Sequence, residues 1–371
     1  MFDYSEQIAA FRNDKVRLPK GFKEKLFQHR DANRNRLITR LPLRIPGLSI
    51  SQSSFKPQGS SAVQTIIQTK FIYEEYDIDD GLVLWRDQLV DADGRELTAD
   101  EVKRHVLEAL KDERFAKQPN MAANAVRVYY KEEDEERHHI DFPVYRKFQD
   151  DDGNMVRELA GEFGWTVSDP TQVNNWFLNE VQVRNSKCTG WGTQMRHLIQ
   201  LLKRFCRSRY AWDLPNGMKL TMLVVECQPA HHDRIDLAFR RLLENLEERL
   251  ETVKVILNLA HPEKPAITRG EADDNVIELL AKIDEALERL VPLDDTDNQT
   301  TKCARDAWDW VFQSDGYFLD YDRKKEEREK AARLETLAAK INSGTARTSC
   351  AGVIGSIGVP NLPHSFYGDS F

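Results

Sequence analysis

Hydrophobic and polar positions change their pattern about halfway along the chain. Between residues 48 and 147, short apolar runs alternate with longer segments of helical period. Runs rich in β-branched and aromatic residues predict strands at 81–85, 125–130 and 139–145. From about residue 168 onwards the period is almost wholly helical. Strands followed by a run of helices favour an α+β fold.

The clearest helix of the first half lies between the first two predicted strands. Thr98 and Glu101 stand at the spacing of a capping box, in which each side chain bonds the backbone of the other. Val102, Val106 and Leu110 follow on one face. The sequence therefore predicts a helix that begins after Thr98 and buries this apolar face.

The second half contains several amphipathic segments. Apolar residues recur every three to four positions in four of them: 195–210, 234–259, 275–291 and 303–312. Upstream, Asp169 and Pro170 predict the start of another helix, because aspartate caps well and proline suits the first turn. That helix would run through Trp176 and Phe177.

Both ends of the chain are more polar. Residues 19–41 form a charged segment of helical pattern, and residues 320–341 predict a solvated surface helix. Residues 344–371 contain five glycines and few charges, which is typical of a flexible tail. We therefore divide the chain into four segments: 1–47, 48–167, 168–343 and 344–371.

Composition narrows the classes of function. The 371 residues include 53 lysines and arginines against 61 aspartates and glutamates, a net charge of −8. Stable binding of nucleic acid draws on a net basic surface and is not expected. We expect no membrane association, because the sequence has neither an apolar run of bilayer length nor the basic start of a signal peptide. The five cysteines form no metal-binding pair and suit a reducing, cytoplasmic setting.

Three carboxylates and a Gly-Ser pair are the candidate chemical groups. Asp77 and Asp79 lie two positions apart, so in a strand they project to the same side, and Asp141 lies in another predicted strand. Gly59 and Ser60 stand shortly before them, and Gly59 is eighteen positions from Asp77. Glycine lets the backbone approach a phosphate, and the serine hydroxyl can donate a hydrogen bond to it.

These groups together indicate metal-dependent chemistry on a nucleotide. Three ionised carboxylates in one place repel one another, and Mg²⁺ with its preference for oxygen ligands relieves that repulsion. Two Mg²⁺ ions, for which Mn²⁺ could substitute, would hold a triphosphate and activate an attacking hydroxyl. Each motif alone is weak, because Gly-Ser pairs are usually turns and acidic pairs are usually solvated. Their order and strand context carry the prediction.

Several segments of the sequence resemble those of one enzyme family. They are Gly59-Ser60, Tyr76-Asp-Ile-Asp-Asp-Gly81, His139-Ile-Asp-Phe-Pro-Val-Tyr145, Ser168-Asp-Pro170 with Trp176-Phe177, and Lys203-Arg-Phe205. In these segments the chain resembles the bacterial cGAS/DncV-like nucleotidyltransferases (CD-NTases), and among them the branch typified by the cyclic GMP-AMP synthase DncV. The resemblance covers roughly residues 20–260.

The resemblance implies a fold, a reaction and a set of site residues. The fold is a polymerase-β-like palm with a mixed or antiparallel sheet, an amino-terminal spine helix and a carboxyl-terminal helical domain. The reaction is Mg²⁺-dependent joining of ATP and GTP, or related nucleoside triphosphates, into a cyclic di- or oligonucleotide for CBASS antiphage signalling. By position, Asp77, Asp79 and Asp141 match the catalytic and metal-binding acids. Gly59 and Ser60 match the phosphate-binding pair.

Two further matches and two departures concern the nucleotide. Ser168 and Asp169 match residues that lie near the bases in the family. Ser61 stands where an aromatic or aliphatic residue is more usual, and residues 65–68 lack the arginine that often follows the family's threonine. The departures affect nucleotide preference and the grip on the triphosphate rather than the metal site.

Cations on a later helix are candidates for phosphate binding. Arg196, Lys203 and Arg207 lie within about 40° of one another at 100° per residue. Lys203 and Arg207 are therefore nucleotide-binding candidates, with a solvated helix face as the alternative reading. The histidine pairs 138–139 and 231–232 are assigned polar or structural roles, because adjacent residues point to opposite sides of a strand.

Two other functions remain open from the sequence. The enzyme could transfer NMP onto a protein or RNA acceptor, or the chain could be a catalytically silent interaction module. The resemblance also implies a possible partner, an E1/E2-like or HORMA-type CBASS protein, which would engage the tail that ends Tyr367-Gly-Asp-Ser-Phe371.

Overall fold

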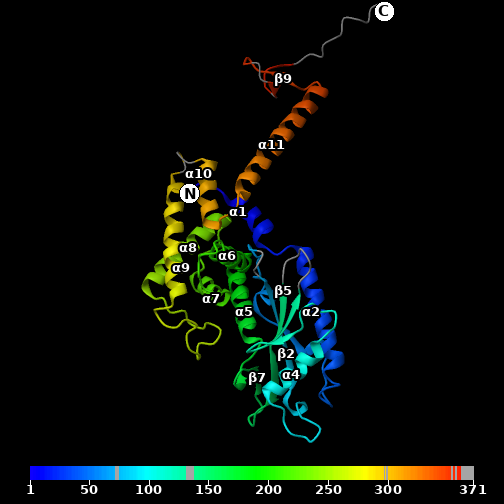
Figure 1. Cartoon of the computed structure of the whole chain (residues 1–371). Helices are drawn as coiled ribbons and strands as arrows, with labels where there is room; N and C mark the ends of the chain where they lie inside the picture. The colour runs from blue at the N-terminus through cyan, green and yellow to red at the C-terminus, as the bar shows by residue number, and fades with distance from the viewer. Residues whose placement is uncertain are drawn as a thin grey trace, which may run out of the picture. The chain divides into compact units, whose positions relative to one another are not determined.

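The structure is a computed structural model that describes residues 1–71, 75–130, 138–295, 297, 300–351, 354–355 and 357–360 (Figure 1). The chain forms two compact units, residues 1–313 and residues 314–371. Its mixture of sheet and helices confirms the predicted α+β class. The finer division into four segments stays a prediction. The predicted partner-binding end, Tyr367 to Phe371, lies outside the described residues.

A mixed sheet forms the base of the first unit. Its strands are β1 (Phe55–Pro57), β2 (Tyr76–Trp85), β3 (Asn120–Met121), β4 (Val126–Tyr130), β5 (His138–Phe142), β6 (Val144–Gln149), β7 (Met155–Gly161) and β8 (Gly164–Val167). Hydrogen bonds connect them in the order β3-β4-β5-β2-β6-β7-β8, and β1 also pairs with β2. β2 is parallel to β5 and β6, and the other pairs are antiparallel.

The strand predicted over residues 139–145 is divided into two strands at Pro143. Proline has no N–H to donate to a ladder, so it interrupts a strand. β5 pairs with the first part of β2, and β6 pairs with the last part. Between them the Pro143 carbonyl oxygen accepts a hydrogen bond from the Leu82 N–H, at an N–O distance of 2.8 Å. The chain therefore stays in contact with β2 on both sides of the break.

Two helices share a hydrophobic core with this sheet (Figure 1). They are α2 (Lys20–Arg40), which is the charged segment of the sequence, and α4 (Ala99–Leu110). The predicted capping box is present, since the Thr98 side chain accepts from the Glu101 N–H and the Glu101 carboxylate accepts from the Thr98 N–H. The buried strand positions in this core include Ile78, Val126, Val128 and Ile140.

A buried ion pair joins α2 to the central strand. Asp80 has the same parity in β2 as Ile78, so it faces the helices, and it is fully buried. The Arg34 guanidinium donates two hydrogen bonds of 2.6 Å to its carboxylate. Burial raises the pKa of Asp80 above its usual range, and the bonds from Arg34 oppose this rise. Asp80 is thus a docking residue for α2, on the face opposite to Asp79.

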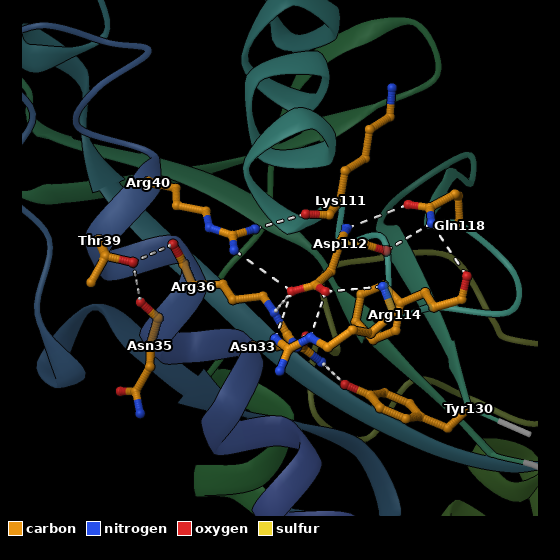
Figure 2. A network of polar contacts seen from close by, with 11 residues as sticks. Asn33, Asn35, Arg36, Thr39, Arg40, Lys111, Asp112, Arg114, Gln118 and Tyr130 are labelled. Atoms are coloured by element: carbon orange, nitrogen blue, oxygen red, sulfur yellow. Dashed lines mark hydrogen bonds and ion pairs between the residues drawn. The ribbon is translucent and has the colours of Figure 1, made fainter. Parts of the chain in front are cut away.

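A second polar network joins the end of α2 to the end of α4 (Figure 2). Asp112 accepts hydrogen bonds from Arg114 and from Arg36, with an N–O distance of 3.1 Å to the Arg36 Nε. Arg40 donates to the Lys111 carbonyl oxygen at 2.7 Å. The hydrogen bonds from Arg114, and then that from Arg36, hold the pKa of Asp112 well below its usual range. The network therefore connects the carboxyl-terminal ends of the two helices.

The rest of the first unit is mainly helical. Its longer helices are α1 (Ser5–Phe11), α5 (Gln172–Lys187), α6 (Trp191–Cys206), α7 (Gly217–Cys227), α8 (Ile235–Thr252), α9 (Asp274–Leu290) and α10 (Thr301–Phe312). Its short helical turns are η1 (Arg12–Val16, a π-helix), η2 (Gln52–Ser54), α3 (Gly59–Ala62), η3 (Arg86–Gln88) and η4 (Val291–Asp294). The Phe11 and Phe312 rings lie 5.2 Å apart between centroids, so the start of this unit packs against its last helix.

Several details differ from the sequence prediction, among them the following three in the helical part. The helix expected to start at Asp169 begins at Gln172, because the Asp169 carboxylate instead accepts from the Thr171 N–H in a turn. The helix predicted over 234–259 ends at Thr252. α7 was not predicted, since its run from Leu220 to Val225 is almost continuously apolar and shows no helical period.

The second unit contains one long helix and a small sheet. α11 (Tyr317–Asn342) includes the predicted solvated segment, and most of its side chains are exposed. Three two-residue strands follow, β9 (Arg347–Thr348), β10 (Ile354–Gly355) and β11 (Val359–Pro360). Within the described residues, none of the helices combines the length and the apolar character that a bilayer span needs.

Candidate active site

Two neighbouring parallel strands bring the three predicted acids together. In the register of β2 and β5, Asp79 lies opposite Asp141 and Asp77 lies opposite His139. All four side chains therefore project to the face of the sheet that α2 and α4 leave uncovered. Asp77 is exposed, whereas Asp141 and His139 are buried. The structure thus places the three carboxylates, which come from two strands, on the same face of the sheet, as the sequence predicted.

The electrostatics of this cluster suit a cation. Burial, and then the charges of Asp77 and Asp141, raise the pKa of Asp79 to about 7. One ligand atom each from Asp77, His139 and Asp141 lies within 4.8 Å of the others. The raised pKa shows that burial, and then the charges of Asp77 and Asp141, disfavour ionisation of Asp79. A divalent ion bound between the carboxylates would relieve their repulsion. The donor set therefore fits a divalent metal ion.

Two side chains that the sequence prediction did not include contact the acids. Arg127 of β4 donates two hydrogen bonds of 2.7 Å to the Asp141 carboxylate. The His139 Nε2 lies 3.2 Å from the Asp77 Oδ1. Burial acts to lower the pKa of His139, but the neighbouring Asp77 outweighs it, so the pKa is raised. The alternation of residues in β4 could have indicated Arg127. It lies between the buried Val126 and Val128, so its side chain projects to the opposite face, where the acids lie.

Gly59 brings the Gly-Ser pair against the acids. The Gln58 N–H donates to the Asp79 carbonyl oxygen at 2.9 Å, and Gly59 follows with φ +64°, in the left-handed region that favours glycine. A Cβ at this position would stand 2.4 Å from the Asp79 Oδ2. Both the conformation and the space therefore require glycine, and Ser60 is placed next to the carboxylates.

We expect Gly59→Ala to reduce activity by about 10²-fold, because the Asp79 carboxylate must move away from the new methyl group. The left-handed conformation adds a loss of about 1–2 kcal/mol in unfolding free energy. Steady-state kinetics and urea denaturation measure the two effects. Gly94→Ala is the matched control, since Gly94 has φ +81° with open space around it. Gly94→Ala should lose stability but keep its activity. Equal activity losses in Gly59→Ala and Gly94→Ala would contradict a role for the contact between Gly59 and Asp79.

A cavity of about 490 Å³ opens beside the Gly-Ser pair and two of the acids. Its lining includes most of the predicted site residues: Gly59, Ser60, Asp77, Asp79, Ser168, Asp169, Lys203 and Arg207. Asp141 is not part of the lining; it lies beside Asp79 on the neighbouring strand and is bonded to Arg127. Trp176 and Phe177 of α5 add aromatic surface. The volume is that of a site for a small molecule such as a nucleotide.

The two residues predicted to lie near the bases, Ser168 and Asp169, line the same cavity as the Gly-Ser pair. Both residues follow β8 along the chain. Asp169 forms an ion pair with Arg157 of β7, at an N–O distance of 2.9 Å. This pair and the turn at Thr171 hold the Asp169 side chain in place.

Of the three cations predicted to share a helix face, two line this cavity. Lys203 is buried, and its Nζ donates to the carbonyl oxygen and to the hydroxyl of Thr65, at 3.1 and 3.2 Å. Burial, and then the charge of Arg207, lower the pKa of Lys203 to about 7. Arg207 is exposed at the cavity. Arg196 instead donates to the Val63 carbonyl oxygen at 3.0 Å and lines a different cavity.

The lowered pKa of Lys203 predicts a pH dependence of stability. Between about pH 7 and pH 10 the unfolded chain binds a proton here that the folded chain does not, so the unfolding free energy should rise with pH. Lys203→Met should remove this rise, as urea denaturation at several pH values would measure. Lys302→Met, which changes an exposed lysine, is the control. A rise that persists in Lys203→Met would contradict the assignment.

The site combines acids on two parallel strands of a mixed sheet with a Gly-Ser turn beside them. Solved structures share the fold. The Vibrio cholerae DncV cyclic AMP-GMP synthase, described as a prokaryotic cGAS homolog, superposes with a TM-score of 0.64 at 16% identity, over 84% of this chain and 96% of that one. Escherichia coli DncV in a 3'-deoxy GTP bound form superposes with a TM-score of 0.59 at 17% identity, over 80% and 92%.

The family assignment comes from the sheet region itself. Residues 53–145 match the family model for the nucleotidyltransferase domain described as cyclic GMP-AMP synthase DncV-like. This range includes the Gly-Ser pair and all three acids. The chain therefore carries a DncV-like nucleotidyltransferase domain, and the resemblance to the cGAS/DncV-like enzymes is confirmed.

Proposed function

We propose that this nucleotidyltransferase joins ATP and GTP into a cyclic, cGAMP-like dinucleotide. The observation that carries the proposal is the convergence of Asp77, Asp79 and Asp141 on one sheet face, where Asp77 and Asp79 line a cavity that Ser168 and Asp169 also line. A relative supports the choice of reaction. A structure of Vibrio cholerae DncV contains the linear intermediate 5' pppA(3',5')pG, and its chain superposes with a TM-score of 0.63 at 16% identity, over 84% of this chain and 96% of that one.

The reaction would consist of two transfers of the same kind. A ribose hydroxyl of one nucleotide attacks the α-phosphorus of the other, a P–O bond forms, and pyrophosphate leaves. The second transfer, within the linear product, closes the ring and releases a second pyrophosphate. Mg²⁺ ions, or Mn²⁺ in their place, would neutralise the phosphates and lower the pKa of the attacking hydroxyl. We assign their binding to Asp77, Asp79 and Asp141.

The side chains of the site have distinct roles in this proposal. The Ser60 hydroxyl donates to the triphosphate, and Gly59 lets the backbone come close to it. Asp141 accepts the proton of the attacking hydroxyl, and Arg127 orients it through its two hydrogen bonds. Lys203 and Arg207 bind phosphate from the helical side of the cavity.

The test is the fate of α-phosphate-labelled nucleotides. The purified chain with Mg²⁺ and each pair of nucleoside triphosphates should yield a phosphatase-resistant nucleotide from ATP with GTP, identified by chromatography and mass spectrometry. Label in a protein or RNA would instead support NMP transfer onto that acceptor. No resistant product from any pair would contradict the proposal and favour a silent interaction module.

The proposal extends to the setting of the reaction. We place the enzyme in the cytoplasm, in CBASS antiphage signalling, with an E1/E2-like or HORMA-type partner at the carboxyl-terminal tail. Truncation after Asn342 should leave synthesis unchanged in vitro and remove the partner from a pull-down. A truncated chain that still retains the partner would refute the assignment to the tail.

A further inference from the structure

A second cavity of the first unit is lined almost wholly by cations and neutral polar groups. Its volume is about 240 Å³, and it lies among η1, the start of α2 and the first half of α6. Five basic side chains line it: Arg12, Arg17, Lys23, Arg196 and His197. The described residues of the lining include no carboxylate. Such a concentration of positive charge stands out in a protein with a net charge of −8.

These cations repel one another, and no carboxylate among the described lining residues compensates their charge. Burial, and then the charge of Arg17, lower the pKa of Arg12 to about 10. Burial lowers the pKa of His197 to about 4, and the charges of Arg12, Arg17 and Arg196 add to this. The histidine is therefore neutral at physiological pH and can donate one hydrogen bond. An unneutralised cluster of this kind is stabilised by an anion.

Two of the guanidinium groups are held in position before any ligand arrives. The Arg12 Nη1 donates to the Gln200 Oε1 at 2.7 Å, and the Arg196 Nε donates to the Val63 carbonyl oxygen at 3.0 Å. Each group keeps further N–H donors beyond those in these bonds. Gln200 is in turn fixed, because its amide donates to the Gln64 carbonyl oxygen at 3.2 Å. Fixed donors lower the entropic cost of binding.

We propose that this cavity binds a compact polyphosphate group, either inorganic pyrophosphate or the phosphate chain of a nucleotide. The guanidinium groups, two of them fixed, match several phosphate oxygens, whereas a single carboxylate would leave most of the charge unpaired. The volume is below the roughly 300 Å³ at which pockets for whole drug-sized ligands begin. A base and sugar would therefore stay outside the cavity.

The site is separate from the proposed active site. Residues 63–66 form the wall between the two cavities, and Ile66 lines both. On one side of this wall Arg196 bonds the Val63 carbonyl oxygen, and on the other Lys203 bonds Thr65. Polyphosphate binding at this cavity does not require the proposed nucleotide transfer. An experiment can therefore contradict one of the two proposals without contradicting the other.

Calorimetry on the full chain tests the site, with pyrophosphate and ATP titrated separately in a metal-free buffer. We expect Arg17→Gln/Lys23→Gln to weaken pyrophosphate binding by about ten-fold or more. Arg104→Gln/Lys111→Gln removes two exposed cations, one in α4 and one directly after it, and should bind like the wild type. Ser60→Ala should also leave this binding unchanged. ATP binding that depends on Arg17 and Lys23 would identify a nucleotide as the source of the phosphates, and its absence would identify free pyrophosphate.

A second variant keeps the test independent of folding. Thr193 lines the cavity at an exposed position in the first turn of α6, where helices favour an acidic residue. Thr193→Glu should therefore fold with an unchanged Tm and lose pyrophosphate binding by charge repulsion. Binding that is equal in the wild type, Arg17→Gln/Lys23→Gln and Thr193→Glu would overturn the proposal. Loss in Ser60→Ala alone would do so as well, since the anion would then lie in the nucleotide pocket.

Discussion

Replacing Asp79 with asparagine should reduce nucleotide transfer by about 10³-fold or more. The reason is that the proposed metal site loses a charged ligand, and metal ions supply several kcal/mol of transition-state stabilisation. Product formation from labelled ATP and GTP measures the effect. The fold should not suffer, because Asp79 is crowded by Asp77 and Asp141, and removing one like charge relieves their repulsion.

A nearby aspartate provides the matched control for this prediction. Asp87 lies in η3, directly after β2, and its side chain is exposed. Asp87→Asn changes the charge by the same amount and should retain full activity. If Asp79→Asn keeps wild-type activity with an unchanged dependence on Mg²⁺, the assignment of Asp79 to the metal site is wrong.

The second large effect is expected for Arg34→Leu, which should lower the unfolding free energy by about 3–5 kcal/mol. The variant leaves Asp80 fully buried without its partner, and removing one member of a buried ion pair has an effect of this size. Chemical denaturation measures it. Arg34→Leu/Asp80→Leu should recover most of the loss, because no unpaired charge then remains in the core.

An exposed ion pair provides the comparison for the Arg34 prediction. Arg104 pairs with Asp100 across one turn of α4, and both side chains are at least half exposed. Arg104→Leu should change the unfolding free energy by less than about 1 kcal/mol. Equal losses in Arg34→Leu and Arg104→Leu would show that the contact between α2 and Asp80 contributes little to the fold.

The alternation of the strands allowed the sequence to separate two neighbouring aspartates. Asp79 and Asp80 have the same side chain, yet the alternation that places Asp79 on the face of Asp77 turns Asp80 to the other face. The structure places Asp80 against Arg34 in the core and Asp79 at the cavity. Local periodicity decides the face of a strand residue, and this needs no knowledge of the tertiary fold.

The positions of Arg127 and His139 in the site depend on pairings between strands and could not be predicted from local patterns. Arg127 contacts Asp141 only because β4 and β5 pair in one register, in which Arg127 lies opposite Asp141. His139 was assigned a polar or structural role, and it lies beside Asp77 through the register of β2 with β5. Registers are set by side-chain packing across a whole sheet, and a single sequence does not display them.

The sequence by itself determined which residues carry charge, which strand face each acid takes and where most helices lie, because these follow from composition and from local periods of two and of 3.6 residues. The tertiary structure alone decided that a Cβ on Gly59 would collide with Asp79, that Lys203 is buried against Thr65 and that Arg12, Arg17 and Arg196 gather around a second cavity. The physical reason is distance along the chain. These contacts join segments far apart in sequence, and only the packing of the folded chain brings them within reach.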